Sequence, residues 1–290
     1  MQDLAERIAV VTGGASGIGL GMAQAFAGRG MKLVIADIEA EPLESAVSEL
    51  VSAGADAIGV ECDVSDAAAV ENLRDRALSQ FGAVHVLCNN AGVAGSGPGT
   101  WEAPQEEWDW VMGVNLWGVV YGIRHFVPVM IEQGAPAHVV NTASMAGLIH
   151  GGGIYGVTKH AVVALSESLF SEFQALGHDI GVSVLCPGWV RTRIMESERN
   201  RPEAPRPAPG ESAALVEMVR KVMSGLVEGG LDPADVGALV ADSIVERRFY
   251  VLPHPDWRNM IENRTQAILE GRDPVNVPPD DGKPWLPELD

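Results

Sequence analysis

The sequence has few cationic residues for its length. It carries 20 lysines and arginines against 39 aspartates and glutamates, a formal charge of −19 over 290 residues. Nucleic acids and anionic membranes are bound through clustered positive side chains, so this balance argues against both as partners. The charge identifies no partner by itself, because an acidic surface is also a common route to solubility.

Cysteine is scarce as well. Cys62, Cys88 and Cys186 each stand at the end of an apolar run, and no C-x-x-C or similar metal-ligand spacing is present. An odd number of thiols in apolar surroundings is typical of reduced core residues inside a cell. The sequence therefore predicts no metal site and a cytoplasmic protein.

Long uncharged apolar runs are also missing. The most apolar stretch, 113–131, is interrupted by Arg124 and His125, and a membrane span needs roughly 20 uninterrupted residues. Residues 7–11 already form a strand-like run, with no charged start and cleavage site before them, so no secretory signal is expected.

What the sequence does contain is a regular alternation of short apolar runs and helical patterns. Hydrophobic residues make up 47% and charged residues 20%, which is ordinary for a globular chain. The alternation predicts an α/β fold, a Rossmann-like doubly wound parallel sheet with helices on both faces. Strands are expected at 7–12, 32–36, 57–61, 84–88, 137–142, 181–186 and 249–252, and helices near 17–29, 40–53, 66–80, 105–132, 153–177 and 233–247.

Two segments depart from this alternation. Residues 201–210 are rich in proline, which predicts a loop, and they lie in a predicted mobile substrate lid over 193–230. The lid is an insertion in a single domain, 1–253, which a C-terminal extension, 254–290, follows. This extension is expected to begin with a helix over 254–270, anchored by Trp257, Ile261 and Ile268, and to end in a proline-rich tail.

The first expected strand runs into a glycine-rich turn, TGGASGIG at 12–19. Gly13, Gly17 and Gly19 permit a tight turn and a close approach of the backbone to a pyrophosphate, which the following helix N-terminus attracts. The second strand ends at Asp37, where a carboxylate accepts hydrogen bonds from an adenosine ribose and repels a 2′-phosphate. No arginine follows nearby in the sequence, so NAD(H) is expected in preference to NADP(H). The alternatives are a plain tight turn and an aspartate that starts the next helix.

Tyr155 and Lys159 lie four residues apart in an expected helix and therefore share one face. A phenol with its ordinary pKa of about 10 is a poor base at neutral pH, but a nearby ammonium group and the positive nicotinamide of an oxidised cofactor both favour the phenolate. Ser144, just past the fifth strand, is placed to hydrogen-bond a substrate oxygen. Taken alone, a tyrosine four residues before a lysine is usually only a helix face.

In their order along the chain, these motifs resemble the short-chain dehydrogenase/reductase family, in its single-domain type, from Ile8 to about Leu252. The resemblance depends on TGGASGIG (12–19), Asp37, Cys62-Asp63-Val64, Asn89-Asn90-Ala91-Gly92, Asn115, Ser144, the run from Tyr155 to Lys159, and Pro187-Gly188.

The resemblance implies a role for each matching residue. It makes Asn115, Ser144, Tyr155 and Lys159 catalytic, with Asn115 holding a water that links Lys159 to solvent. It places Asp63 and Val64 at the adenine, and Val190 and Thr192 near the nicotinamide carboxamide. The implied cofactor-binding set is Gly13, Ser16, Gly17, Ile18, Gly19, Asp37, Ile38, Asp63, Val64, Asn90, Ala91, Gly92, Tyr155, Lys159, Pro187, Gly188, Val190 and Thr192.

The interval between Ser144 and Tyr155 is a little shorter than is usual for the family, and Thr142 offers a second hydroxyl. Ser144 is preferred because it directly precedes Met145-Ala146-Gly147, matching the family's Ser-x-Ala-Gly. The missing residues are then expected in the loop 148–154, where deletions are easily absorbed.

These residues predict an NAD(H)-dependent oxidoreductase that interconverts a bulky secondary alcohol and its ketone. A carboxylate substrate would need a positioned arginine, and 142–159 contains none; Arg191 and Arg193 are the nearest. The alternatives are a non-catalytic nucleotide-binding protein of the same fold and a nucleotide-sugar epimerase or dehydratase. Substrate-pocket candidates are Met145, His150, Trp189 and Met195, for which ordinary packing or, for His150, a solvated loop position is the competing reading.

The resemblance also implies a homo-oligomer, a tetramer or a dimer. The expected contact surface is formed by the long helices at 105–132 and 153–177, which carry more apolar residues than one buried face needs. These residues are Trp110, Trp117, Phe126, Leu165, Leu169 and Phe173.

Overall fold

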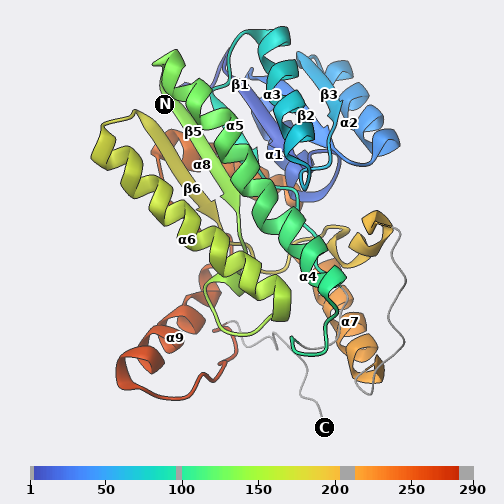
Figure 1. Cartoon of the computed structure of the whole chain (residues 1–290), viewed down its shortest axis with the longest axis vertical. Helices are drawn as coiled ribbons and strands as arrows, with labels where there is room; N and C mark the ends of the chain where they lie inside the picture. The colour runs from blue at the N-terminus through green and yellow to red at the C-terminus, as the bar shows by residue number, and fades with distance from the viewer. Residues whose placement is uncertain (1–2, 96–99, 203–212, 281–290) are drawn as a thin grey trace.

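Seven parallel strands form one sheet, in the order β3-β2-β1-β4-β5-β6-β7 (Figure 1). This is a computed structural model, and it describes residues 3–95, 100–202 and 213–280. All seven expected strands are present, and the predicted α/β, Rossmann-like fold is confirmed. The strands are β1 (Ile8–Thr12), β2 (Lys32–Asp37), β3 (Ala57–Glu61), β4 (Val86–Asn89), β5 (Ala137–Thr142), β6 (Ile180–Leu185) and β7 (Tyr250–Val251).

The expected helices are present with small shifts at their ends. The expected helix over 105–132 is a continuous run in which a π-helical turn, η1 (Gly113–Trp117), separates α4 (Gln105–Met112) from α5 (Gly118–Gln133). The other helices are α1 (Gly17–Ala27), α2 (Ala40–Ser52), α3 (Ala67–Phe81), α6 (Gly153–Leu176), α7 (Ala213–Glu228), α8 (Pro233–Glu246) and α9 (Arg258–Glu270), with short 3₁₀ turns η2 (Met145–Gly147), η3 (Ile194–Asn200) and η4 (Pro255–Trp257).

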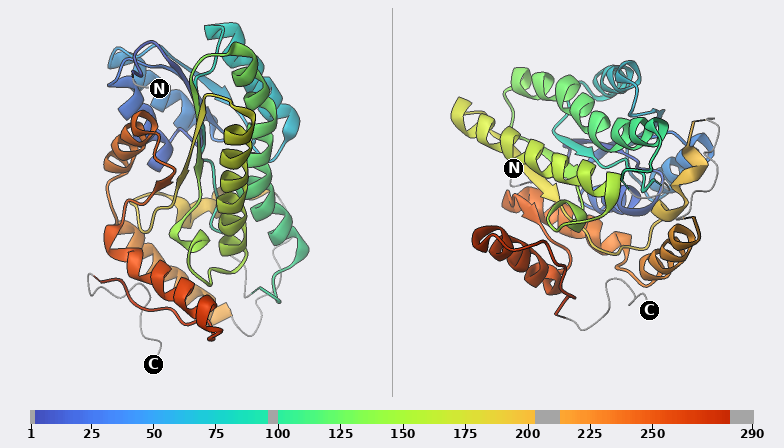
Figure 2. Two further views of the ribbon diagram at one scale, coloured as in Figure 1. Left: turned by 90° about the vertical axis from the view of Figure 1, so that its left-hand side faces the viewer. Right: turned by 60° about the horizontal axis from the view of Figure 1, so that its bottom comes forward.

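Helices cover both faces of the sheet (Figure 2). On one face, Phe26 of α1 and Ile244 of α8 pack with Val11 of β1. On the other face, Leu73 of α3, Phe126 of α5 and Phe173 of α6 pack in a second cluster, which includes the neighbouring strand residue, Val10. Because successive strand side chains point to opposite faces, a strand buried on both faces must be apolar throughout.

The chain order reverses between β1 and β4, which are neighbours in the sheet although β2 and β3 intervene in the sequence. β1 is followed outward by β2 and β3 on one side, and by β4 to β7 on the other. Such a switch point opens a crevice at the carboxyl ends of the strands, where open α/β sheets bind their ligands.

One helical run among the described residues, Gln105–Gln133, is long and apolar enough to cross a membrane, judged by length and composition only. In this fold Val119, Phe126 and Met130 of that run are buried in clusters with residues of the sheet and of α6. Packing between layers of the protein therefore accounts for part of its apolar character, and 39% of its most apolar window is buried.

The predicted lid and tail are described only in part. Of the lid, η3 and α7 are seen, whereas 203–212, most of the proline-rich loop, lies outside the described residues, as does 281–290 of the tail. Trp257 and Ile261 do anchor the C-terminal helix as expected. Ile268 does not, because it lies on the outward face of α9 and is 64% exposed.

Candidate active site

A cavity of about 1010 Å³ lies at the carboxyl ends of the strands. Its wall contains residues at or just after the ends of β1, β2, β4, β5 and β6, represented by Gly13, Asp37, Asn90, Ser144 and Pro187. Every predicted site residue except Gly19 and Asn115 lines this cavity. They are Gly13, Ser16, Gly17, Ile18, Asp37, Ile38, Asp63, Val64, Asn90, Ala91, Gly92, Ser144, Met145, His150, Tyr155, Lys159, Pro187, Gly188, Trp189, Val190, Thr192 and Met195.

The glycine-rich turn leaves room for an anion at the start of α1. Gly13 has a φ of 62°, and a Cβ there would lie 2.8 Å from the Cα of Ala91. Gly19 allows the helix to pack closely against the turn, since a Cβ on it would lie 2.1 Å from the carbonyl oxygen of Gly13. No acidic residue occupies the first turn of α1, so its N–H groups and dipole favour a pyrophosphate.

Asp37 is held in place at the end of β2. Its carboxylate accepts hydrogen bonds from the backbone N–H groups of Ala15 and Glu39, both at 3.1 Å. Burial raises the pKa of Asp37, and these backbone hydrogen bonds oppose that shift because they favour the ionised form. The carboxylate, the turn and the helix N-terminus together fit the adenosine and pyrophosphate of a dinucleotide.

Ser144 is the hydroxyl that reaches Tyr155. It caps η2, accepting a hydrogen bond from the N–H of Ala146 at 3.1 Å, and it also hydrogen-bonds Tyr155. The alternative hydroxyl, on Thr142, donates instead to Oδ1 of Asn90 at 3.2 Å. The geometry therefore favours Ser144 over Thr142 as the partner of Tyr155.

The short link between Ser144 and Tyr155 is closed by three consecutive glycines. Gly151, Gly152 and Gly153 have φ values of 98°, 81° and 55°, which L side chains rarely adopt. They turn the chain from η2 directly into α6. They lie in the loop 148–154, where the sequence predicts that the interval is shortened relative to the family.

Lys159 is one turn of α6 beyond Tyr155, and its Nζ lies 5.4 Å from the centre of the tyrosine ring. The ammonium group donates to the carbonyl of Thr142 at 2.9 Å, and burial lowers its pKa to about 8. Burial also raises the pKa of Tyr155, and the hydrogen bond from Ser144 only opposes this shift. Of the two charges that the sequence expects to favour the phenolate, only Lys159 belongs to the chain itself, and in the free chain burial still keeps the pKa of Tyr155 above its ordinary value.

Asn115 lies behind the cavity in the π-helical turn η1. Its amide accepts from the N–H of Val93 at 2.8 Å and donates to the carbonyl of Val93 at 2.9 Å and to Thr158 at 3.2 Å. A Cβ on Gly92 would lie 3.3 Å from Asn115 Oδ1 and 3.5 Å from Lys159 Nζ, so both side chains approach the position where this glycine lacks a side chain. What the structure shows directly is that Asn115 fixes the loop after β4 beside Lys159. Single π-turns inside helices are frequent at functional sites.

The substrate end of the cavity is mostly apolar. Trp189 stacks edge-on against Trp257 with ring centres 6.0 Å apart, so the C-terminal extension contributes to the wall. Two polar atoms at this end, Nε1 of Trp189 and Nδ1 of His150, have no hydrogen-bond partner within the described chain.

Charged residues of the cavity wall were missed by sequence reasoning. Buried Glu107 of α4 forms an ion pair with Arg201, whose guanidinium also bonds Glu198 and lies 4.3 Å from the ring of Trp110. The pair joins residues 94 positions apart, and no sequence pattern links them.

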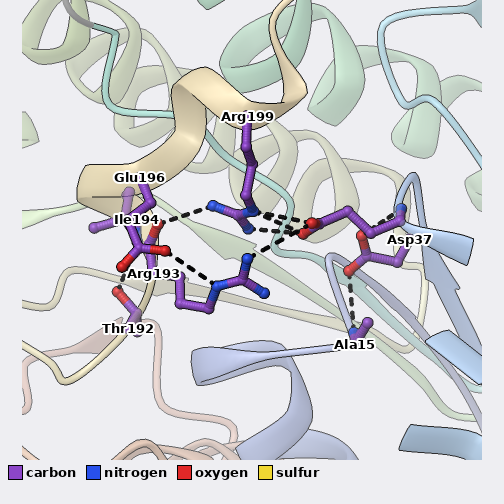
Figure 3. A network of polar contacts seen from close by, with 8 residues as sticks. Ala15, Asp37, Thr192, Arg193, Ile194, Glu196 and Arg199 are labelled. Carbon is purple, nitrogen blue, oxygen red and sulfur yellow. Dashed lines mark hydrogen bonds and ion pairs between the residues drawn. The ribbon is translucent and has the colours of Figure 1, made fainter. Parts of the chain in front are cut away.

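Two arginines that are distant from Asp37 in the sequence lie near it in the fold. No arginine follows Asp37 nearby in the sequence, but the fold brings Arg193 and Arg199 next to the end of β2 (Figure 3), where both interact with Glu39. These arginines come from η3 and the residue before it, more than 150 positions further along the chain.

The three cysteines are free and buried, as expected for core residues. Burial raises the pKa of Cys62 and Cys186 to about 12, so both remain thiols at neutral pH. Within the described residues, no group of three or more histidines, cysteines and acidic residues is arranged to hold a metal ion.

A doubly wound sheet with a glycine-rich turn, an acidic β2 end and a serine, tyrosine and lysine in one cavity defines a dinucleotide-dependent oxidoreductase. The family model described as short chain dehydrogenase matches residues 7–203. The chain belongs to the short-chain dehydrogenase/reductase family. It is therefore an oxidoreductase.

Individual relatives match over nearly the whole chain. A 1-deoxy-11-beta-hydroxypentalenate dehydrogenase of Streptomyces exfoliatus is 37% identical over 95% of this chain and 92% of its own length. A C alpha-dehydrogenase of a Sphingobium species is 34% identical over 97% and 91%. A short chain dehydrogenase/reductase from Burkholderia phymatum, solved in complex with NAD, has 42% identity and a TM-score of 0.91, covering 96% of this chain and 99% of that one.

Proposed function

We propose that this protein is an NAD(H)-dependent dehydrogenase that interconverts a bulky secondary alcohol and its ketone. The observation that carries the proposal is one continuous cavity, which joins the ribose-binding end at Asp37 to the Ser144–Tyr155 pair and then to a largely apolar pocket. When bound, the nicotinamide accepts or returns the hydride. The chain supplies binding, orientation and the proton.

Tyr155 is the proposed proton-transfer group. Its hydroxyl takes the proton of the alcohol during oxidation and returns it to the alkoxide during ketone reduction. Ser144 holds the substrate oxygen by hydrogen bonding, and its fixed position at the N-terminus of η2 keeps the reacting groups aligned. Lys159 contributes a buried positive charge next to the phenol, which favours its ionised form.

The preference for NAD(H) follows from the charge at the end of β2. Asp37 is fixed by two backbone N–H groups, and its carboxylate would lie close to any 2′-phosphate on the adenosine ribose. The relative from Burkholderia phymatum was solved with NAD, which supports the same assignment here.

The proposed substrate is bulky and apolar because the part of the cavity next to Tyr155 is roomy and lined mainly by apolar side chains. Met145, Ile149, Ile154, Trp189 and Trp257 all line it. The two arginines considered from the sequence are committed to carboxylates: Arg191 pairs with Asp232, and Arg193 with Glu39 and Glu196. A small hydroxy acid therefore has no obvious bidentate partner.

A substrate panel tests the proposal. Benzylic and steroidal secondary alcohols should reduce NAD much faster than lactate-like acids or short sugars do, and NAD should give a higher kcat/KM than NADP. Tyr155→Phe is the control for enzyme-dependent turnover. Equal kcat/KM for the two cofactors would contradict the NAD assignment, and preference for acids or sugars would contradict the substrate class. Cofactor binding without turnover of any alcohol would favour the non-catalytic alternative.

We also propose a homo-oligomer formed through α5 and α6, preferably a tetramer. Four of the six residues expected on the contact surface are instead buried inside the chain: Trp110, Phe126, Leu169 and Phe173. Apolar side chains nonetheless remain exposed on these helices, and light scattering at micromolar concentration tests whether they pair; a monomer would contradict the proposal. The exposed residues are Trp117, Ile131, Val157, Phe170 and Leu176.

A further inference from the structure

The ribose end of the cavity contains a second carboxylate, which two arginines hold. Glu39 follows Asp37 by two residues, and Arg199 donates three hydrogen bonds to its carboxylate, at 2.7, 2.9 and 3.1 Å. Nη2 of Arg193 lies 3.8 Å from the same carboxylate. We refer to Glu39, Arg193 and Arg199 as the Glu39 clasp. Figure 3 shows both guanidinium groups directed toward the end of β2, where Asp37 lies.

The clasp is well ordered by its contacts. Nη1 of Arg199 donates to the carbonyl of Arg193 at 3.1 Å, and Nε of Arg193 donates to Glu196 at 3.3 Å. The hydrogen bond from Arg199 lowers the pKa of Glu39, so the pair is charged at neutral pH. All three clasp residues line the same cavity as Asp37.

The clasp places positive charge where an NADP-dependent enzyme would need it. A guanidinium binds a phosphate in the same planar, bidentate manner as it binds a carboxylate. Arg199 is also close enough to Asp37 for that carboxylate to stabilise its charged form. A 2′-phosphate entering this end would therefore compete with Glu39 for Arg199.

We propose that Glu39 is a second determinant of cofactor choice. It favours NAD(H) because it holds Arg199 and Arg193 in ion pairs, so that neither arginine is left to pair with a 2′-phosphate. This inference rests on the proposed NAD(H)-dependent function and adds a residue to it. Asp37 excludes the phosphate by its own charge. Glu39 does so by its charge and by occupying the cations that would bind the phosphate.

The two carboxylates should act together. With Asp37 replaced, Glu39 still holds Arg199, and with Glu39 replaced, Asp37 becomes the carboxylate that Arg199 pairs with. Only when both carboxylates are removed is the guanidinium of Arg199 free to bind a phosphate. The effects of the two substitutions on phosphate binding should therefore exceed the product of the single effects.

The test uses Asp37→Ser, Glu39→Gln, the double variant, and the double variant with Arg199→Met. Adenosine 2′,5′-bisphosphate and adenosine 5′-monophosphate serve as probes, and their binding is measured by calorimetry without any turnover. The double variant should bind the bisphosphate about tenfold or more tighter than the two single effects predict, because a charge-assisted contact is gained. Adding Arg199→Met should remove that excess.

A matched control is Glu71→Gln, which removes the carboxylate of another ion pair, with Arg74 on α3, outside the cavity. It should leave the binding of both probes unchanged, and a thermal melt of each variant checks that it folds. A gain that is only the product of the single effects, or that survives Arg199→Met, would overturn the role of Glu39 proposed here.

The result also separates this inference from the proposed function. If the wild-type enzyme uses NADP as well as NAD, the cofactor assignment itself is wrong. If the wild type prefers NAD and the binding effects of the two substitutions simply multiply, Asp37 alone sets the preference and only the Glu39 inference fails.

Discussion

The floor and the cover of the cavity are built in different ways. The floor, formed by the strand ends and α6, holds its groups by burial and backbone hydrogen bonds; Lys159 is 3% exposed and donates to the carbonyl of Thr142. The cover, residues 193–201, is held largely by ion pairs to Glu39 on one side and Glu107 on the other. Of these two ion pairs, the one between Arg199 and Glu39 is partly exposed and is therefore the more strongly screened by salt.

This difference assigns separate tasks to the two regions. The floor fixes the reacting groups relative to each other, so changes there should affect catalysis and stability strongly. The cover contacts the ribose end and the substrate end of the cavity, so changes there should affect which ligands bind. Four experiments test this division, in order of decreasing expected effect.

Replacing the proton-transfer group of the floor should have the largest effect. Tyr155→Phe removes only the hydroxyl, so kcat should fall by about 100-fold or more while the Kd for NAD stays within a few-fold. Steady-state kinetics and calorimetry measure the two quantities. A variant with near-normal turnover would show that Tyr155 is not the acid/base.

Replacing Asn115 should destabilise the floor. Asn115→Leu leaves the buried N–H and carbonyl of Val93 without their partners, which costs about 1–3 kcal/mol for each unsatisfied group. Urea unfolding should show a loss of about 2 kcal/mol or more. Asn263→Leu, which removes one hydrogen bond on α9 at the surface, is the control and should change stability much less. Equal effects of the two would contradict the proposed role of Asn115 in fixing the loop.

The pH dependence should report the buried tyrosine and lysine. Burial raises the pKa of Tyr155, so the phenolate fraction, and with it kcat/KM for alcohol oxidation, should rise as pH increases above neutrality, while ketone reduction falls. Burial lowers the pKa of Lys159 to about 8, so its positive charge is present at neutral pH and is lost above that value.

Lys159→Ala should therefore reduce oxidation most near neutral pH, and the difference from wild type should narrow above about pH 8. For Lys159→Arg, which keeps the positive charge, the difference from wild type should change less with pH. Profiles of wild type and Lys159→Ala that stay parallel across this range would show that the charge of Lys159 does not act on Tyr155.

Breaking the cover should have the smallest effect on stability. Arg199→Met removes an ion pair that is partly exposed, and such pairs contribute about 1 kcal/mol or less. Because salt screens this pair, added salt should narrow the small difference in stability between wild type and variant. A large loss of stability would show that the cover is a structural part of the fold.

The floor could be predicted from the sequence because its signals are local. Apolar strands, the glycine turn, Asp37 and the spacing of Tyr155 and Lys159 are each short patterns, and a parallel sheet gathers strand ends at one edge. The three glycines at 151–153 explain how a short interval still brings Ser144 to Tyr155.

The cover could not be predicted in the same way. Glu39 and Arg199 lie 160 positions apart, and Glu107 and Arg201 lie 94 apart, so no periodicity joins them. Side-chain environment was equally hidden: the sequence places Lys159 next to Tyr155 on one helix face, but it does not show the burial that raises the pKa of Tyr155. Such effects depend on tertiary packing.

The central claim is that the floor aligns a secondary alcohol with NAD for direct hydride transfer, with Tyr155 handling the proton. A bulky benzylic alcohol carrying deuterium on its carbinol carbon, incubated with NAD and the wild-type enzyme, tests this claim directly. Mass spectrometry of the reduced cofactor should find one deuterium in each NADH formed, and Tyr155→Phe should form it far more slowly. NADH formed without deuterium would contradict the account.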